Sequence, residues 1–251
     1  MNKSVFLLFT LIALSSCLNA NGVSVEELNS YGHETNIVDH NAWDTLLKKY
    51  VADNGDVDYK GFKKDTEVLN SYIFYLSTQI PSEQWSKQEK LAYFINLYNA
   101  NTVKLIIDNY HIKSIKDISS PWTKNRIKIW DNNYSLSDIE NDILRKMNEP
   151  RIHFAINCAS KSCPKLLNIA FTAENVDSLL EQAAKDFINN PEKNRISENR
   201  IQLSKIFKWY KEDFTKNGNL IDYINQYSMV KIQQDVDVSY MEYDWSLNKQ
   251  H

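Results

Sequence analysis

The chain has 251 residues, of which 43% are apolar, 12% aromatic and 24% charged. These values are typical of globular proteins that bury a full-sized core. Its 29 Lys and Arg against 32 Asp and Glu give a net charge of −3, so the chain lacks the basic field that binds a run of phosphates. We therefore expect no nucleic-acid partner. Only 5 Gly and 5 Pro leave little material for linkers, which favours a single domain.

The first twenty residues differ from the rest. Lys3 precedes an apolar run, residues 5–14, that is too short to span a bilayer and is typical of a secretory signal peptide. The run ends in Leu14-Ser15-Ser16-Cys17, which resembles the lipobox of bacterial lipoproteins, where the cysteine is acylated and becomes the mature N-terminus. The alternative is ordinary cleavage after Ala20, but Leu18 is bulky for a position that usually holds a small residue.

This pattern predicts a lipoprotein-type signal peptide over residues 1–17, a polar tether over residues 18–37 and one globular domain over residues 38–248. Several acyl chains anchor a protein stably where one chain does not. We expect an exported protein of the bacterial cell envelope, held on a membrane by lipid at its periplasmic or outer surface. Its substrate or partner there is not indicated by the sequence.

Helical spacing of apolar residues begins at Trp43 and predicts a helix to about Val51. Further helices are predicted over residues 66–79, 173–189, 206–214 and 220–227. Two capping-box patterns, at Ser86/Glu89 and Ser137/Glu140, predict the start of the longest helix and of a shorter helix to about residue 147. Short strands or hairpins are predicted over residues 121–134, 152–156, 195–204 and 236–243. The fold class is therefore α+β: a helix-rich single domain with short strands and hairpins.

Asn99 lies on or beside the apolar stripe of the longest predicted helix, four residues after Ile95 and three before Thr102. An amide in such a position must find several hydrogen-bond partners. Asn99 is therefore informative whether its role is structural or catalytic.

Two cysteines, Cys158 and Cys163, remain if Cys17 is acylated or removed. In an oxidising compartment, a pair five residues apart can close a disulfide that shapes a loop. The alternative is chemical: Cys163 precedes Pro164, a residue favoured in the first turn of a helix, and a thiol at a helix start beside His153 would be shifted towards thiolate. With Asn99 as an orienting amide, these residues are the types found in papain-like thiol hydrolases.

Metal sites fit the sequence poorly, and no cofactor is expected. Residues 53–59 look like a calcium loop around Gly55, but that register puts Tyr50 at the first ligand position and Gly61 where a bidentate Glu belongs. Zinc would have three ligands, His153, Cys158 and Cys163, and no spaced fourth.

Four segments of the chain resemble the blocks of the domain of unknown function 547 family: residues 91–100 (LAYFINLYNA), 135–140 (SLSDIE), 153–164 (HFAINC to SCP) and 243–248 (YDWSLN). The resemblance runs in order from about Trp43 to Asn248. Because the activity of that family is not settled, the resemblance implies fold and boundaries more than chemistry. It also draws attention to polar residues within the blocks: Asn96, Asn99, Glu140, His153, Cys163 and Asp244.

Two hypotheses follow. The first is a thiol-dependent hydrolase or transferase acting on an amide or ester, with Cys163 as nucleophile, His153 as base and Asn99 as orienting residue; Asn96, Glu140, Cys158 and Asp244 are further candidates for the site. The second is a non-catalytic binding module in which a Cys158–Cys163 disulfide shapes a recognition loop.

Overall fold

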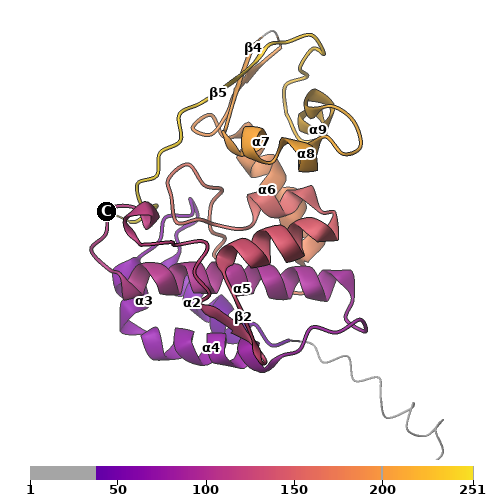
Figure 1. Cartoon of the computed structure of the whole chain (residues 1–251). Coiled ribbons are helices and arrows are strands. Elements are labelled where there is room, and N and C mark those ends of the chain that lie inside the picture. Colours follow the sequence, from indigo (N-terminus) through magenta and orange to yellow (C-terminus); the bar gives the residue numbers. More distant parts are fainter. Residues whose placement is uncertain (1–37, 199, 251) are drawn as a thin grey trace, which may run out of the picture. The chain divides into compact units, whose positions relative to one another are not determined.

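Helix α5 (Lys87–Asp108) lies at the centre of the first of two hydrophobic clusters. We describe residues 38–198 and 200–250 of a computed structural model; the predicted signal peptide, Cys17 and the tether lie outside these residues. In Figure 1, α5 crosses the lower half of the domain, with α4 (Thr66–Thr78) beneath it and the β3–β5 sheet at the opposite end. Because α5 is covered on most of its circumference, polar side chains on it must find partners inside the domain.

The start of α5 is set by Ser86, whose hydroxyl accepts a hydrogen bond from the backbone N–H of Glu89 at 3.0 Å. This is the first half of the predicted capping box. The second half is absent, because the Glu89 carboxylate accepts from the backbone N–H of Val38 at 2.9 Å. Glu89 thus joins the first described residue of the domain to its central helix, and burial raises the pKa of this carboxyl.

Helices α3 (Tyr59–Lys64) and α4 pack against α5, and α2 (Asn41–Tyr50) packs on α3 and α4. The sequence predicted α2 and α4 but not α3, which begins where the Asp58 carboxylate accepts from the N–H of Gly61. A Cβ on Gly61 would lie 2.4 Å from the Tyr50 ring. Only glycine therefore lets α2 and α3 approach this closely.

The segment after α5 forms a hairpin and then short helical turns. Strands β1 (Ile127–Ile129) and β2 (Asn132–Tyr134) pair antiparallel, as predicted. The 3₁₀ turn η1 (Ile115–Asp117) precedes this hairpin. After the hairpin come the π-helical η2 (Asp138–Leu144) and the 3₁₀ turns η3 (Arg145–Met147) and η4 (Pro150–Phe154). The cap of η2 lies two residues earlier than predicted: Ser135 accepts from the N–H of Asp138, and Asp138 accepts from the N–H of Ser135.

The predicted strand over residues 152–156 is wrong. Its apolar residues lie in and just after η4, a turn that begins with Pro150 in the first helical position. The Glu149 carboxylate accepts from the backbone N–H of Arg151 and caps the turn. Alternating apolar residues in such a short run do not separate a strand from a buried helical turn.

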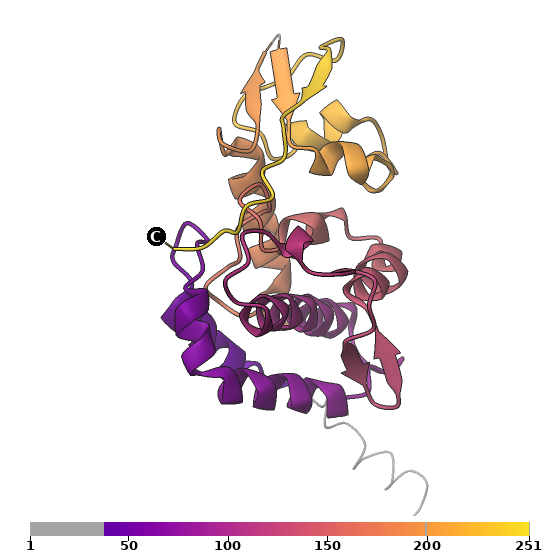
Figure 2. The ribbon, with the colours of Figure 1, turned by 60° about the vertical axis from the view of Figure 1, so that its left-hand side comes forward.

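The second hydrophobic cluster is rich in phenylalanine and joins α6 (Val176–Asn189) to a small sheet and three short helices. Strands β3 (Arg195–Ser197) and β4 (Arg200–Leu203) form the predicted hairpin, and β5 (Val238–Tyr240) pairs parallel with β4. The predicted helix over residues 206–214 is split at Tyr210 into α7 (Ile206–Trp209) and α8 (Lys211–Phe214), and α9 (Leu220–Asn225) follows. Figure 2 shows the three strands side by side above α6.

After β5 the chain returns to the first cluster. It makes single bridges with Ser160 through Leu247, with Ser114 through Ser246 and with Val57 through Lys249. The observed class is the predicted one, a helix-rich α+β domain with small sheets. Among the helices of the described residues, none is both long enough and apolar enough to cross a membrane.

Candidate functional site

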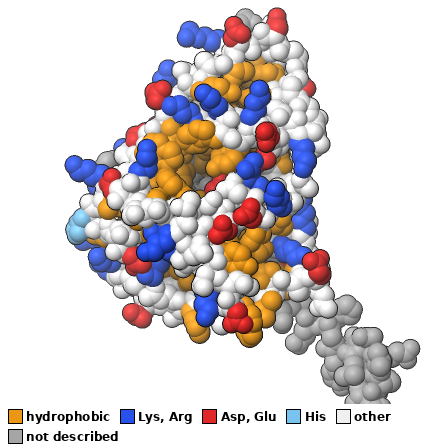
Figure 3. Space-filling model, in the orientation of Figure 1, with side chains coloured by type: hydrophobic (Ala, Val, Ile, Leu, Met, Phe, Trp, Pro, Cys, Tyr) orange, Lys and Arg blue, Asp and Glu red, His pale blue; other side chains and the backbone are white. Residues whose placement is uncertain are grey.

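A cleft of about 280 Å³ opens between η2, α7, the loop at residues 155–171 that holds both cysteines (the cysteine loop), and the C-terminal segment at residues 243–248. Figure 3 shows hydrophobic side chains gathered around a hollow in this part of the surface, below the region of α7. The cleft is lined by six aromatic side chains, two cysteines, four polar groups and three other apolar residues: Tyr98, Trp122, Trp209, Tyr210, Tyr243, Trp245, Cys158, Cys163, Ser137, Glu140, Asn141, His153, Ile156, Pro164 and Ile206. Four of the seven candidate residues, Cys163, His153, Glu140 and Cys158, are among them.

Asn99 holds the start of the cysteine loop on α5. Its amide nitrogen donates to the carbonyl of Ala155 at 3.0 Å, and its amide oxygen accepts from the N–H of Asn157 at 2.8 Å. The side chain is buried, as its helical position predicted. Asn99 therefore pairs with the backbone as a neighbouring strand would, which gives it a structural role in the geometry of the loop.

Asn96 does the same at the other end of that loop. It donates to the carbonyl of Phe171 at 2.7 Å and accepts from the N–H of the same residue at 3.2 Å. Because Asn96 and Asn99 are three residues apart on one helix, they lie on the same face. Together they fasten residues 155–171 across α5 at two points.

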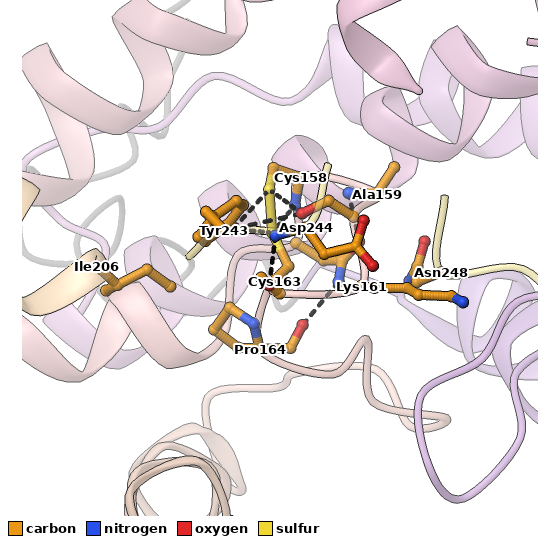
Figure 4. Close-up of a disulfide and its surroundings, with 12 residues drawn as sticks. Cys158, Ala159, Lys161, Cys163, Pro164, Ile206, Tyr243, Asp244 and Asn248 are labelled. Atoms are coloured by element: carbon orange, nitrogen blue, oxygen red, sulfur yellow. Dashed lines mark hydrogen bonds between the residues drawn. A yellow bond between two sulfur atoms is a disulfide. The ribbon is translucent and has the colours of Figure 1, made fainter. Parts of the chain in front are cut away.

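The two cysteines of this loop form a disulfide, with Cα atoms 6.1 Å apart. Inside the loop, Asn157 donates to the carbonyl of Pro164 at 2.7 Å and accepts from the N–H of Ala159 at 2.8 Å. Figure 4 shows the ring of Tyr243 beside the disulfide, with its hydroxyl 3.2 Å from the sulfur of Cys163. The loop is therefore closed covalently and held by hydrogen bonds from inside and from the C-terminal segment.

Asp244 belongs to that C-terminal segment and lies outside the cleft lining. Its carboxylate accepts from the N–H and the hydroxyl of Ser246, at 2.9 and 2.6 Å, and these hydrogen bonds hold its pKa below the usual range. Its backbone N–H donates to the Ser162 hydroxyl, and its carbonyl accepts from the Ser162 N–H. Asp244 thus shapes its own turn and joins it to the cysteine loop.

His153 lies on η4, with its Nε2 atom 2.7 Å from a carboxylate oxygen of Asp213 on α8. An ionised carboxylate only accepts hydrogen bonds, so Nε2 donates. Arg145 donates to both oxygens of the same carboxylate, at 2.6 and 3.0 Å. The ring of Tyr210 stacks on the imidazole with centroids 3.9 Å apart, and the His153 side chain is only 1% exposed. His153 is therefore part of a buried polar network that joins the two clusters.

Glu140 projects from the π-helical η2 and is buried. The hydroxyl of Tyr98 donates to it at 3.4 Å. Burial raises the pKa of Tyr98 and Tyr210, and the charge of Glu140 adds to the effect in both. Burial also raises the pKa of Tyr243. All three phenols therefore keep their protons at neutral pH and act as hydrogen-bond donors.

The structure brings His153 and Cys163 to one cleft but gives each of them another partner. Cys163 is bonded to Cys158, and His153 donates to Asp213; among the described residues, no hydrogen bond joins the histidine to the cysteine. Nor does a helix begin at Pro164, whose carbonyl accepts from Asn157. The triad of Cys163, His153 and Asn99 stays a prediction, and it requires a reduced Cys163 because the thiolate is the nucleophile.

Several residues of the site were not indicated by the sequence. Arg145, Asp213 and Tyr210 have no motif, because a partly buried ion pair between residues 68 positions apart leaves no local pattern. Trp245 lies within the family-like segment at residues 243–248, which by itself gives no sign that this side chain lines a cleft. Four aromatic side chains of the lining come from two distant parts of the sequence, and only the fold shows that these parts meet: Trp209, Tyr210, Tyr243 and Trp245.

Metal binding has no support from the arrangement of the described side chains. Within residues 38–198 and 200–250, no group of three or more His, Cys, Asp or Glu side chains is placed to hold an ion. The cysteines that could have been zinc ligands are bonded to each other.

Residues 82–188 match the family described as "Protein of unknown function, DUF547". This match supports the resemblance found in the sequence, over a shorter range than residues 43–248. It covers α5, Glu140, His153 and the disulfide loop but ends before α7 and the C-terminal segment. Neither the curated proteins nor the solved structures give a match to this chain.

Proposed function

We propose that this domain is a binding module whose disulfide loop forms one wall of an aromatic cleft. The observation that carries the proposal is the Cys158–Cys163 bond: the residue with the best claim to be a nucleophile is instead a fixed part of the cleft wall. Apolar and aromatic walls with a few placed polar groups are typical of small-molecule sites, and about 300 Å³ is the lower end of their usual volume. The cleft is close to that size.

The hydrogen bonds and the disulfide around the cleft fix the conformation of the loop that forms its wall. The loop is held by two amides, a disulfide and the Tyr243 hydroxyl. A rigid, preformed wall lowers the entropic cost of binding a ligand. The thiol hydrolase hypothesis needs the opposite state, an open Cys163 thiol within hydrogen-bond reach of a base, and therefore a reduced protein.

The location we propose is the outside of the cytoplasmic membrane, with a lipid anchor at Cys17. Two features of the chain support it: the short apolar run that ends in Leu14-Ser15-Ser16-Cys17, and a disulfide, which persists in oxidising compartments. The ligand is then a component of the cell envelope or a molecule that enters it.

The proposal is tested by screening a set of small organic fragments against the oxidised protein by two-dimensional NMR. The six tryptophan indole N–H signals serve as reporters, assigned by Trp→Phe variants. We expect fragments to shift the signals of Trp122, Trp209 and Trp245, which line the cleft, and to leave Trp43 in the core unchanged. Reduction of the disulfide should weaken the shifts. If no fragment perturbs the three cleft signals, the binding function is wrong.

A further inference from the structure

One charged side chain of the cleft lining, Glu140, has no ion-pair partner among the described residues. Glu140 is the only Asp, Glu, Lys or Arg side chain among the lining residues of this described region. Two cations lie near the lining: Arg145, which donates to both oxygens of Asp213, and Lys116, whose ammonium lies 5.3 Å from the Trp245 ring. Arg145 is thus paired with Asp213, and Glu140 is a buried carboxylate of the lining with no ion-pair partner among the described residues.

Most other polar groups of the lining are paired; among the described side chains, the Nδ1 atom of His153 is buried and has no hydrogen-bond partner. Asn141 donates to the carbonyl and the hydroxyl of Ser137, both at 3.1 Å, and accepts from Arg145 at 2.9 Å. A strongly hydrated cation, such as a metal ion or a primary ammonium, would lose its water here without gaining enough acceptors. An alkylated cation has few or no N–H groups to satisfy.

The aromatic rings add an attraction for positive charge. Trp122 and Trp245 meet edge to face at 5.6 Å, and Trp209 stacks on Trp245 at 5.8 Å. Trp209 is 46% exposed, so this ring group reaches solvent. The faces of tryptophan rings attract cations within about 6 Å of the ring centre. Lys116 already uses this attraction, with its ammonium 5.3 Å from the Trp245 ring.

Resting on the binding function proposed above, we infer that the cleft takes a small alkylated organic cation of the trimethylammonium type. Its methyl groups would pack against Trp122, Trp209 and Trp245, with its charge directed towards Glu140. Tyr98 donates to this carboxylate at 3.4 Å, and a carboxylate can accept several hydrogen bonds, so Glu140 keeps acceptor capacity for the cation.

The test compares choline with 3,3-dimethyl-1-butanol, a neutral molecule of the same shape. Both are titrated into the full oxidised protein, and binding is followed by the same indole signals and by calorimetry. Choline should bind at least about tenfold more tightly, the difference expected for a cation on desolvated aromatic faces. Equal affinity for the two molecules, or no binding of choline, overturns the inference.

Two variants separate charge from aromatic surface. Glu140→Gln keeps the shape and should lower choline affinity about tenfold while leaving the neutral alcohol unchanged. Trp209→Ala, a change at an exposed position, should weaken both. The matched control is Glu212→Gln on α8, which is exposed and outside the cleft lining and should bind choline like the parent. If Glu140→Gln does not fold, as judged by its melting curve, the comparison of choline with the neutral alcohol on the parent protein still decides.

The two proposals can fail separately. If fragments shift the cleft tryptophans but choline has no advantage over the alcohol, the binding function stands and the cationic ligand is wrong. If no fragment reaches the cleft, the binding function itself is wrong.

Discussion

The hydroxyl of Tyr243 lies 3.2 Å from the sulfur of Cys163, although the two residues are 80 positions apart in the chain. This contact joins the C-terminal segment to the disulfide loop, and the backbone of Asp244 and Ser246 continues the junction at Ser162 and Lys161. The cleft therefore has walls from distant parts of the sequence that support each other. A substitution in the C-terminal segment is therefore expected to alter the conformation of the disulfide loop, and the reverse.

Asn99→Leu should destabilise the domain by about 3 kcal/mol, because it leaves the carbonyl of Ala155 and the N–H of Asn157 without partners inside the protein. Chemical unfolding gives this value. The control is Asn101→Ala on the same helix, whose half-buried amide bonds only to the carbonyl of Leu97; it should cost less than about 1 kcal/mol. Equal effects of the two changes, or none, would contradict the role of Asn99 as a backbone clamp.

The sequence predicted much of the fold, because most helices carry regular apolar spacing and several carry a capping residue. Ser86 marks the start of α5 in both the pattern and the structure. The pattern was not sufficient at residues 152–156, where a capped 3₁₀ turn replaces the expected strand. It also missed α3, which depends on the contact between Gly61 and Tyr50.

For the candidate site, the sequence found residues but not their partners. The helical position of Asn99 predicts a buried amide, and Asn99 is buried; Asn96 is indicated only by the family resemblance. The hydrogen bonds of the two amides to Ala155 and Phe171 depend on how the loop crosses α5. The partner of His153 lies 60 residues away on a short helix. Such pairings follow from tertiary packing, which no local periodicity encodes.

Asp213→Asn should lower the free energy of unfolding, and the loss should depend on pH. Burial acts to raise the pKa of Asp213, but hydrogen bonds from His153 and Arg145 outweigh it and hold the pKa well below its usual range. A carboxyl with a lowered folded-state pKa stabilises the fold above its unfolded value of about 3.9 and loses that contribution as the pH falls through the folded value. The difference in the free energy of unfolding between parent and variant should therefore reach its full value by about pH 5 and shrink below about pH 4.

Urea unfolding at a series of pH values from 5 downwards measures this difference. Asp235→Asn, at an exposed position, is the control and should change the free energy of unfolding by less than about 0.5 kcal/mol at each pH. A difference for Asp213→Asn that grows on acidification would contradict the assigned hydrogen bonds.

Cys17→Ala should release the protein from the membrane or block its maturation, because Cys17 is the expected acylated residue at the end of the predicted lipobox. The parent protein should partition into the detergent phase and carry the mass of acyl chains on its N-terminus, since several chains are needed for stable anchoring. Phase separation and intact-mass measurement check both points. An unmodified N-terminus at Asn21 would show ordinary cleavage instead.

The most direct test of a binding module with a structural disulfide is the state of its two thiols. The protein is prepared from an oxidising compartment and treated with iodoacetamide at pH 6, well below the ordinary cysteine pKa of about 8.5. Its peptides are then mapped by mass spectrometry. The melting curves of Cys158→Ser and Cys163→Ser are compared in parallel. We expect no alkylation at either residue, and a matched loss of about 2 kcal/mol in the two variants, the amount the chain-entropy model gives for so short a loop. Rapid alkylation of Cys163 alone, with Cys163→Ser as stable as the parent, would contradict the binding module and favour the thiol hydrolase.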